Sequence, residues 1–209
     1  MKSGEISMNK EKSILVADYK DRIIWFDGSI TQKTASRFSK IVDRLNKLRV
    51  APIVFYIRGP GGDPWSAFSM INDVFNSSSP IGCVAHCYVA SGCFTLTQAG
   101  LWRAALPGTK FVFHSAEGMF HAHQKDIQMT QQELSDWAER LKLADFIQFF
   151  YFSMRGRPVW IIEEMLKSSK VLSLPQAKKL RLVDSYFKKT DFVEDRKKIR
   201  KVIRKQIKF

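Results

Sequence analysis

Short apolar runs alternate with amphipathic stretches through the first half of the chain. Residues 23–26, 53–57 and 81–85 are largely apolar, and runs of this length predict buried strands. The stretches that follow the first two runs repeat apolar residues every three or four positions, which predicts amphipathic helices. These residues are Phe38, Ile41, Val42, Leu45 and Leu48 in the first helix, and Trp65, Phe68, Ile71 and Phe75 in the second. Strands and helices in this alternation predict βαβ units with parallel strands.

Turn and capping residues mark the ends of these elements. Thr31 is placed to cap the first helix, and Pro80 stops the second because proline cannot continue a helix. The pair Gly61-Gly62 predicts a turn after the strand at 53–57. Residues 91–99 predict a third helix, and residues 110–114 predict a further strand.

The second half of the chain has a mainly helical pattern. Residues 127–153 predict one long helix with an unusually aromatic end at 146–152. Such a helix often projects to meet a partner subunit, although its end can equally be buried in its own core. Residues 160–166 predict another helix, and a short one follows with Ser173 as its N-cap and Pro175 in its first turn.

Composition predicts one soluble domain. The chain has 209 residues, of which 45% are apolar, and it has no apolar stretch of the ~20 residues that span a bilayer. A polar N-terminus without a signal-peptide core predicts a cytoplasmic protein. Three cysteines in such a chain predict reduced thiols. Cys83 and Cys87 have the spacing of metal ligands, but with only His86 nearby we expect two small buried residues, and we expect His86 at a strand end.

Positive charge is concentrated at the carboxy terminus. The net charge is +14, and residues 194–209 hold eight Lys and Arg residues against two acids, which contributes +6. Apolar residues recur at near-helical spacing in this tail, so it predicts a basic amphipathic helix. A membrane surface, a nucleic acid or an acidic partner could receive it. The alternative is a solvated helix that packs its apolar stripe on its own domain.

Ser91 and His114 are the candidate catalytic pair. Ser91 lies where an apolar strand meets a helix, and His114 ends the strand at 110–114. Functional groups in parallel sheets gather at the carboxyl ends of strands, where Gly61-Gly62 is also expected. A serine nucleophile, a histidine base and backbone amides are the parts of an acyl-transfer site. The plainer alternatives are an N-cap for Ser91, a strand-end residue for His114 and solvated loop residues for His121 and His123.

These segments, in this order, resemble the proteolytic subunit of Clp protease, within the Clp/crotonase superfamily. The resemblance covers roughly residues 20–188. Its motifs are Pro60-Gly61-Gly62, Ala90-Ser91-Gly92-Cys93-Phe94, Ala105-Leu106-Pro107 through His114, the helix at 126–153, and Leu172-Ser173 through Leu182-Val183-Asp184.

The resemblance implies an α/β fold, a Clp/crotonase-type spiral of βαβ units with a projecting handle helix. It implies a domain at 20–190 between an N-terminal segment at 1–19 and a basic tail at 191–209. It also implies a serine peptidase that needs no cofactor and no metal. Ser91 would be the nucleophile and His114 the base, and the amides of Gly62 and Gly92 would hold the oxyanion. The implied partners are a peptide or unfolded protein substrate, further copies in a homo-oligomeric ring, and an ATP-dependent unfoldase.

Ser169 stands where the family has the aspartate of its triad. A serine can accept a hydrogen bond from the imidazole but carries no charge to stabilise the imidazolium. Two alternatives therefore stay open: a weak or inactive structural or regulatory subunit, and a crotonase-type acyl-CoA enzyme on the same fold. Gly92 directly after the nucleophile is a further departure, and resembles the signal peptide peptidase A branch with its serine–lysine pair.

Overall fold

The structure is a computed structural model, and it describes residues 13–114, 132, 135–136, 138–145, 159–168, 171–186, 193–195 and 197. Several sequence predictions fall outside these residues. They concern Ser169, His121, His123, most of the long helix at 127–153, and the tail beyond residue 197. Of the long helix, residues 138–145 are described and are helical.

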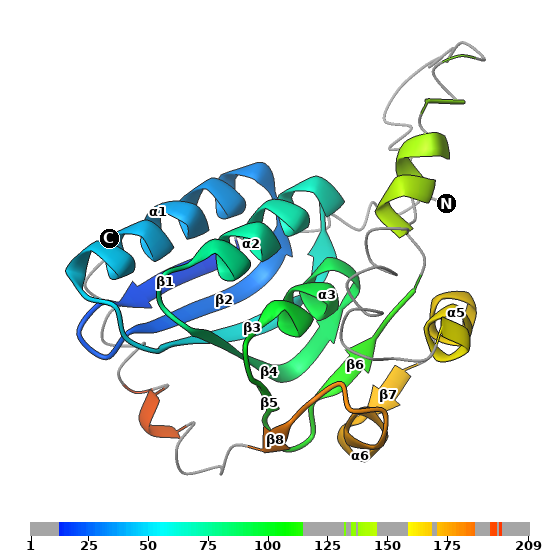
Figure 1. Cartoon of the computed structure of the whole chain (residues 1–209). Helices are drawn as coiled ribbons and strands as arrows, with labels where there is room; N and C mark the ends of the chain where they lie inside the picture. Colours follow the sequence, from blue (N-terminus) through cyan, green and yellow to red (C-terminus); the bar gives the residue numbers. More distant parts are fainter. Residues whose placement is uncertain are drawn as a thin grey trace, which may run out of the picture.

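A single twisted sheet organises the described part of the chain (Figure 1). Its main strands run in the order β1 (Ile14–Asp18), β2 (Ile23–Ile30), β3 (Ile53–Gly62), β4 (Ile81–Ala90), β5 (Arg103–Ala105) and β8 (Ser185–Tyr186). β6 (Lys110–Val112) pairs with β4, and β7 (Val171–Ser173) pairs with β6. The pairs β1–β2 and β6–β7 are antiparallel and the others are parallel, which confirms the α/β fold class.

Helices α1 (Gln32–Leu48), α2 (Pro64–Asn76) and α3 (Ser91–Ala99) cover one face of this sheet, and α5 (Val159–Ser168) and α6 (Leu174–Lys179) follow later in the described part of the chain (Figure 1). Thr31 caps α1 as predicted, since its hydroxyl accepts from the amide of Thr34 at 3.2 Å. Ser173 is the N-cap of α6, with proline in the first turn. No helix within the described ranges is both long and apolar enough to cross a membrane.

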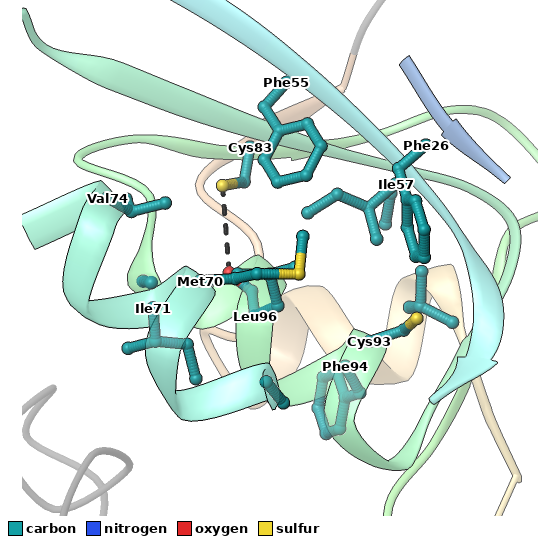
Figure 2. Close-up of a cluster of buried hydrophobic side chains, with 14 of the residues drawn as sticks. Phe26, Phe55, Ile57, Met70, Ile71, Val74, Cys83, Cys93, Phe94 and Leu96 are labelled. Carbon is teal, nitrogen blue, oxygen red and sulfur yellow. Dashed lines mark hydrogen bonds between the residues drawn. The ribbon is translucent and has the colours of Figure 1, made fainter. Parts of the chain in front are cut away.

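The main core lies between these three helices and the sheet. Figure 2 shows Phe26, Phe55 and Ile57 on the sheet side and Met70, Ile71 and Val74 of α2 facing them. α3 contributes Cys93, Phe94 and Leu96 to the same cluster. The thiol of Cys83 in β4 donates to the carbonyl of Leu96 at 3.8 Å, so this strand and α3 also share a polar contact.

The predicted helix faces need correction at three positions. Leu48, Trp65 and Phe75 were expected to pack on the core, and all three are exposed. In α2 the buried apolar residues are instead Ala67, Met70, Ile71 and Val74. The helical period was right, but Trp65 and Phe75 belong to a neighbouring stripe that does not face the sheet.

The strands are longer than predicted. β2 continues through Asp27 and Gly28, and β3 continues through Gly62, so the glycine pair lies within a strand and not in a turn. Ser29 pairs with Gly61 and Ile30 with Gly62 in parallel register. β4 likewise runs to Ala90, which places His86 inside the strand, 2% exposed, with its ring centroid 4.4 Å from that of Trp25. Cys83 is buried as expected, whereas Cys87 is exposed.

Candidate active site

Ser91 lies at the junction of β4 and α3 in a backbone conformation that is rare for a residue with a side chain. Its φ is +49°, in the left-handed region. Ala90 is the N-cap of α3, so Ser91 is the first helical residue and the plain N-cap interpretation is wrong. A serine on a strained strand-to-helix turn presents its hydroxyl at the edge of the sheet, which suits a nucleophile.

Gly61 of β3 packs directly against this junction. A Cβ atom on Gly61 would lie 2.7 Å from Cβ of Ser91 and 2.8 Å from the amide nitrogen of Gly92. The φ of Gly61 is +101°, which also favours glycine. Gly62 faces elsewhere, because a Cβ there would lie 2.2 Å from the carbonyl oxygen of Ile30. Gly61 therefore packs against the start of α3, and Gly62 packs against β2.

A bulge in β4 brings this part of the chain together. Ile57 pairs with Ala85, but Gly59, two residues later, pairs with Val89, so β4 has two extra residues at this point. The bulge contains Cys87, whose φ is +58°. Bulges of this kind redirect a strand, and here the redirected end of β4 leads directly into Ser91.

His114 reaches the same edge of the sheet from β6. Ala90 and Val112 are register partners in the parallel pair β4–β6. Ser91 follows Ala90 directly, and His114 lies two residues beyond Val112, so both residues leave neighbouring strands in the same direction. Between them, Phe113 packs its ring 5.4 Å from that of Phe94 in α3. The structure thus brings Ser91, His114 and Gly61 to one edge, with Ser91 and His114 half-buried.

The first turn of α3 has amides available for an anionic oxygen. Ala90 supplies no side-chain cap to this helix, and Gly92 is its second residue. Uncapped amides and the helix dipole together favour negative charge at this position. The predicted oxyanion role of Gly92 is compatible with this placement, and that of Gly62 stays a prediction.

Cys93 is a buried packing residue beneath this turn and not a second nucleophile. Burial, with a smaller contribution from the Asp27 carboxylate, raises the pKa of its thiol to about 12, while the backbone amide of Gly61 acts in the opposite direction. A Cβ on Gly59 would lie 3.1 Å from its sulfur and 2.1 Å from the carbonyl oxygen of Gly28. Cys93 therefore fills the space under the strand that carries Gly61.

The far end of α3 is held by a polar network from the late part of the chain. Gln98 donates to the carbonyl of Leu182 at 3.2 Å and accepts from Arg103 at 3.3 Å. Arg103 in turn donates to the carboxylate of Asp184 through Nε at 3.0 Å, Nη2 at 2.5 Å and its backbone amide at 2.8 Å. A two-pronged guanidinium–carboxylate contact fixes orientation as well as distance. The sequence placed Asp184 only within a motif and did not identify Arg103 or Gln98.

The arrangement suits acyl transfer. It provides a serine at a strained turn, a histidine two residues beyond the end of β6, and helix amides that begin at the serine. Within the part of the chain that the structure describes, no group of three or more His, Cys, Asp or Glu residues is placed to hold a metal ion. The contact of Gly61 with the Ser91 junction was not foreseen from the sequence, because the glycine pair was interpreted as a turn.

Comparisons with known proteins agree with one another. The family model described as Clp protease matches residues 7–190. An ATP-dependent Clp protease proteolytic subunit from Marchantia polymorpha is 25% identical over 169 residues, covering 79% of this chain and 81% of that protein. An ATP-dependent Clp protease proteolytic subunit 1 from Chlamydia caviae is 26% identical over 190 residues, covering 88% and 95%.

Two further similarities bear on fold and on activity. The solved structure of a ClpP1 mutant from Listeria monocytogenes superposes with a TM-score of 0.72 at 20% identity, covering 83% of this chain and 95% of that one. This similarity shows the fold. An Arabidopsis thaliana protein, the ATP-dependent Clp protease proteolytic subunit-related protein 2, chloroplastic, is 22% identical over 180 residues, covering 85% of this chain and 62% of that protein.

Proposed function

The chain belongs to the Clp protease family, and on that basis we propose that it is a serine peptidase that hydrolyses peptide bonds through Ser91 and His114. The observation that carries the proposal is the strained backbone of Ser91, φ +49°, at the carboxyl end of β4 beside Gly61. Non-glycine residues rarely adopt this conformation without a reason, and strain of this kind clusters at active sites.

The proposed chemistry has two steps. Oγ of Ser91 attacks the substrate carbonyl carbon and its proton passes to His114, which delivers it to the leaving amine as the C–N bond breaks. Water then attacks the acyl-enzyme with His114 again as base, which releases the acid and restores Ser91. The amides of Gly92 and Gly62 are proposed to hold the negative oxygen in both steps. Removing one such donor typically costs roughly 10²–10³ in rate.

Ser169 supports a second candidate, a subunit of low or no activity. Without a carboxylate at that position the imidazolium gains less stabilisation, and neutralising the equivalent aspartate in a well-studied triad costs on the order of 10⁴ in rate. The similarity to a protein named as proteolytic subunit-related is in line with this candidate. We propose weak peptidase activity as the form that reconciles Ser169 with the strained Ser91.

A covalent probe separates the two candidates. A fluorophosphonate should label the wild-type protein at Ser91, fail to label Ser91→Ala, and label Ser69→Ala at the wild-type rate, since Ser69 is an exposed serine of α2. Ser169→Asp should increase labelling and peptide turnover. Absence of labelling in both the wild type and Ser169→Asp would reject the peptidase and favour the inactive subunit. Acyl-CoA binding without labelling would point to the crotonase-type alternative.

Exposed apolar residues support the proposal of a homo-oligomeric ring. Phe75 and Leu101 are 48% and 68% exposed, and they border a hollow of about 210 Å³ that Val74, Pro80 and Ile81 also line. Leu48 and Val50 are exposed at the end of α1. Exposed groups of apolar side chains commonly mark contacts between proteins. Sedimentation at micromolar concentration should show a species larger than 24.1 kDa, and a purely monomeric protein would contradict the ring.

The relatives' names as parts of an ATP-dependent protease support two partner proposals. We propose a peptide or unfolded protein as substrate and an ATP-dependent unfoldase as the protein that delivers it. ATP-stimulated degradation of an unfolded protein by this chain together with such an unfoldase would support both. Degradation at the same rate with and without the unfoldase would reject the second.

A further inference from the structure

A row of apolar side chains crosses the sheet on the face opposite α1, α2 and α3. Register pairing aligns its members on neighbouring strands from β1 to β5; they are Val16, Trp25, Tyr56, Val84 and Ala104. We call this row the aromatic face, since the rings of Trp25 and Tyr56 lie 5.3 Å apart at its centre. Of the helices named above, α1, α2, α3, α5 and α6, none contributes a described residue to this cluster.

Tyr56 is nevertheless fully buried, and its hydroxyl meets the carboxy-terminal segment. It donates to Oδ2 of Asp195 at 2.5 Å, across 139 residues of sequence. Residues 193–195 and 197 are helical, and Figure 1 shows them in red on the side of the sheet away from α1 and α2. Asp195 is half-buried, whereas Val193, Glu194 and Lys197 are exposed, so among the described residues of this segment Asp195 is the one that faces the sheet.

The chemistry of position 195 fits this contact. Residues 194–209 hold eight basic residues and two acids. A Lys or Arg at position 195 could not accept the hydrogen bond from the tyrosine hydroxyl, because neither side chain has an acceptor. An O–H···O⁻ bond at this distance is charge-assisted and stronger than a neutral one. A buried tyrosine hydroxyl also needs a hydrogen-bond partner, so both Tyr56 and Asp195 would lose this hydrogen bond if the segment moved away.

We propose that residues 193–195 and 197 form a cover that docks on the aromatic face, and that the Tyr56–Asp195 hydrogen bond holds it there. The start of the basic tail then packs on the protein's own sheet and does not bind a nucleic acid or a membrane. The cover also controls whether this apolar face is available to other proteins. The inference does not depend on the proposed peptidase activity.

Tyr56→Phe tests the contact, because it removes the hydroxyl and keeps the ring. Lys197 is exposed but helical, and trypsin needs an extended backbone, so cleavage after Lys197 requires this segment to unfold. The rate of that cleavage, followed by intact mass, measures the opening. Loss of a hydrogen bond to a charged group should raise the rate roughly 10- to 100-fold. Binding of a dye specific for apolar surface should rise with it. Tyr19→Phe is the matched control, since the Tyr19 ring keeps its contact with the Arg44 guanidinium, 4.4 Å from the ring centroid.

Asp195 allows the same bond to be tested from its half-exposed side, without altering the buried face. Asp195→Ala should be cleaved as fast as Tyr56→Phe, and Asp195→Asn, which keeps a neutral acceptor, at an intermediate rate. Wild-type cleavage rates in both Tyr56→Phe and Asp195→Ala would overturn the proposal. So would fast cleavage of Tyr19→Phe, because the effect would then not be specific to the bond.

Discussion

Gly61→Ala tests whether the contact between β3 and the Ser91 junction is as tight as the structure implies. The new Cβ would lie 2.7 Å from Cβ of Ser91, 2.8 Å from N of Gly92 and 2.9 Å from O of Ala90. Two of these three atoms are backbone, so they cannot move aside by changing a rotamer. At φ +101° the substitution also adds backbone strain of about 1–2 kcal/mol. Overpacking of this kind adds about 1–3 kcal/mol.

Gly108→Ala is the matched control. Gly108 also has a positive φ, +80°, but a Cβ there would meet nothing within 4 Å. It carries the strain without the clash, so the difference between the two variants isolates the contact with Ser91. We expect Gly61→Ala to lower the free energy of unfolding by about 1–3 kcal/mol more than Gly108→Ala.

Urea denaturation measures this difference directly, provided that the slope of the transition is unchanged. Fluorophosphonate labelling of Ser91 provides a second readout. A shift of the nucleophile should slow labelling roughly 10- to 100-fold in Gly61→Ala, whereas Gly108→Ala should label like the wild type. Equal destabilisation by the two substitutions would refute the reasoning, because it would mean that Gly61 is not packed against the Ser91 junction.

Three other predictions concern individual side chains. Ser91→Gly should be about 1 kcal/mol more stable than Ser91→Ala in urea, because only glycine relieves the left-handed strain at φ +49°; equal stabilities would contradict this. Iodoacetamide at pH 8 should modify exposed Cys87 and spare Cys93, since a pKa of about 12 leaves on the order of one thiolate in 10,000; mass spectrometry of tryptic peptides decides. Asp73 has a raised pKa because of desolvation, despite an opposing hydrogen bond from Ser39 at 3.4 Å, and its buried Oδ2 has no hydrogen-bond partner among the residues that the structure describes. A raised carboxyl pKa lowers stability once the group is ionised, so Asp73→Asn should have a higher unfolding temperature than the wild type at pH 7. Thermal unfolding should show this gain disappearing near pH 3, where Asp73 is protonated.

Hydrophobic periodicity predicted the elements that have long, regular patterns. The cores of β2, β3 and β4 and the helices α1 and α3 were placed correctly, because a buried run or a repeated apolar stripe leaves a clear signal. Strands of two or three residues, such as β7 and β8, are too short to show a period and depend on neighbours distant in sequence.

The glycines explain the main error at the site. Gly61 and Gly62 were interpreted as a turn because glycine commonly breaks strands, but here they extend β3 past close neighbours. Their reason for being glycine is tertiary: Gly61 contacts Ser91, and Gly62 contacts Ile30. A pattern of residue types identifies that an unusual backbone is needed but does not say which neighbour requires it. Arg22 is a similar case, because its residue type does not reveal that its buried guanidinium donates to the carbonyl of Leu45, at 2.9 Å.

The network at the far end of α3 has a consequence for the order in which the protein is completed during synthesis. The helix that begins at Ser91 is joined through Gln98 to Leu182, and Arg103 is joined to Asp184, 81 residues further along the chain. A nascent chain can therefore pair β1 to β4 long before these contacts exist. Only when residue 184 has left the ribosome does α3 gain its second anchor. Ser91 begins α3, and the contacts that anchor this helix through Gln98 and Arg103 form only after residue 184 has been made, 81 residues after Arg103.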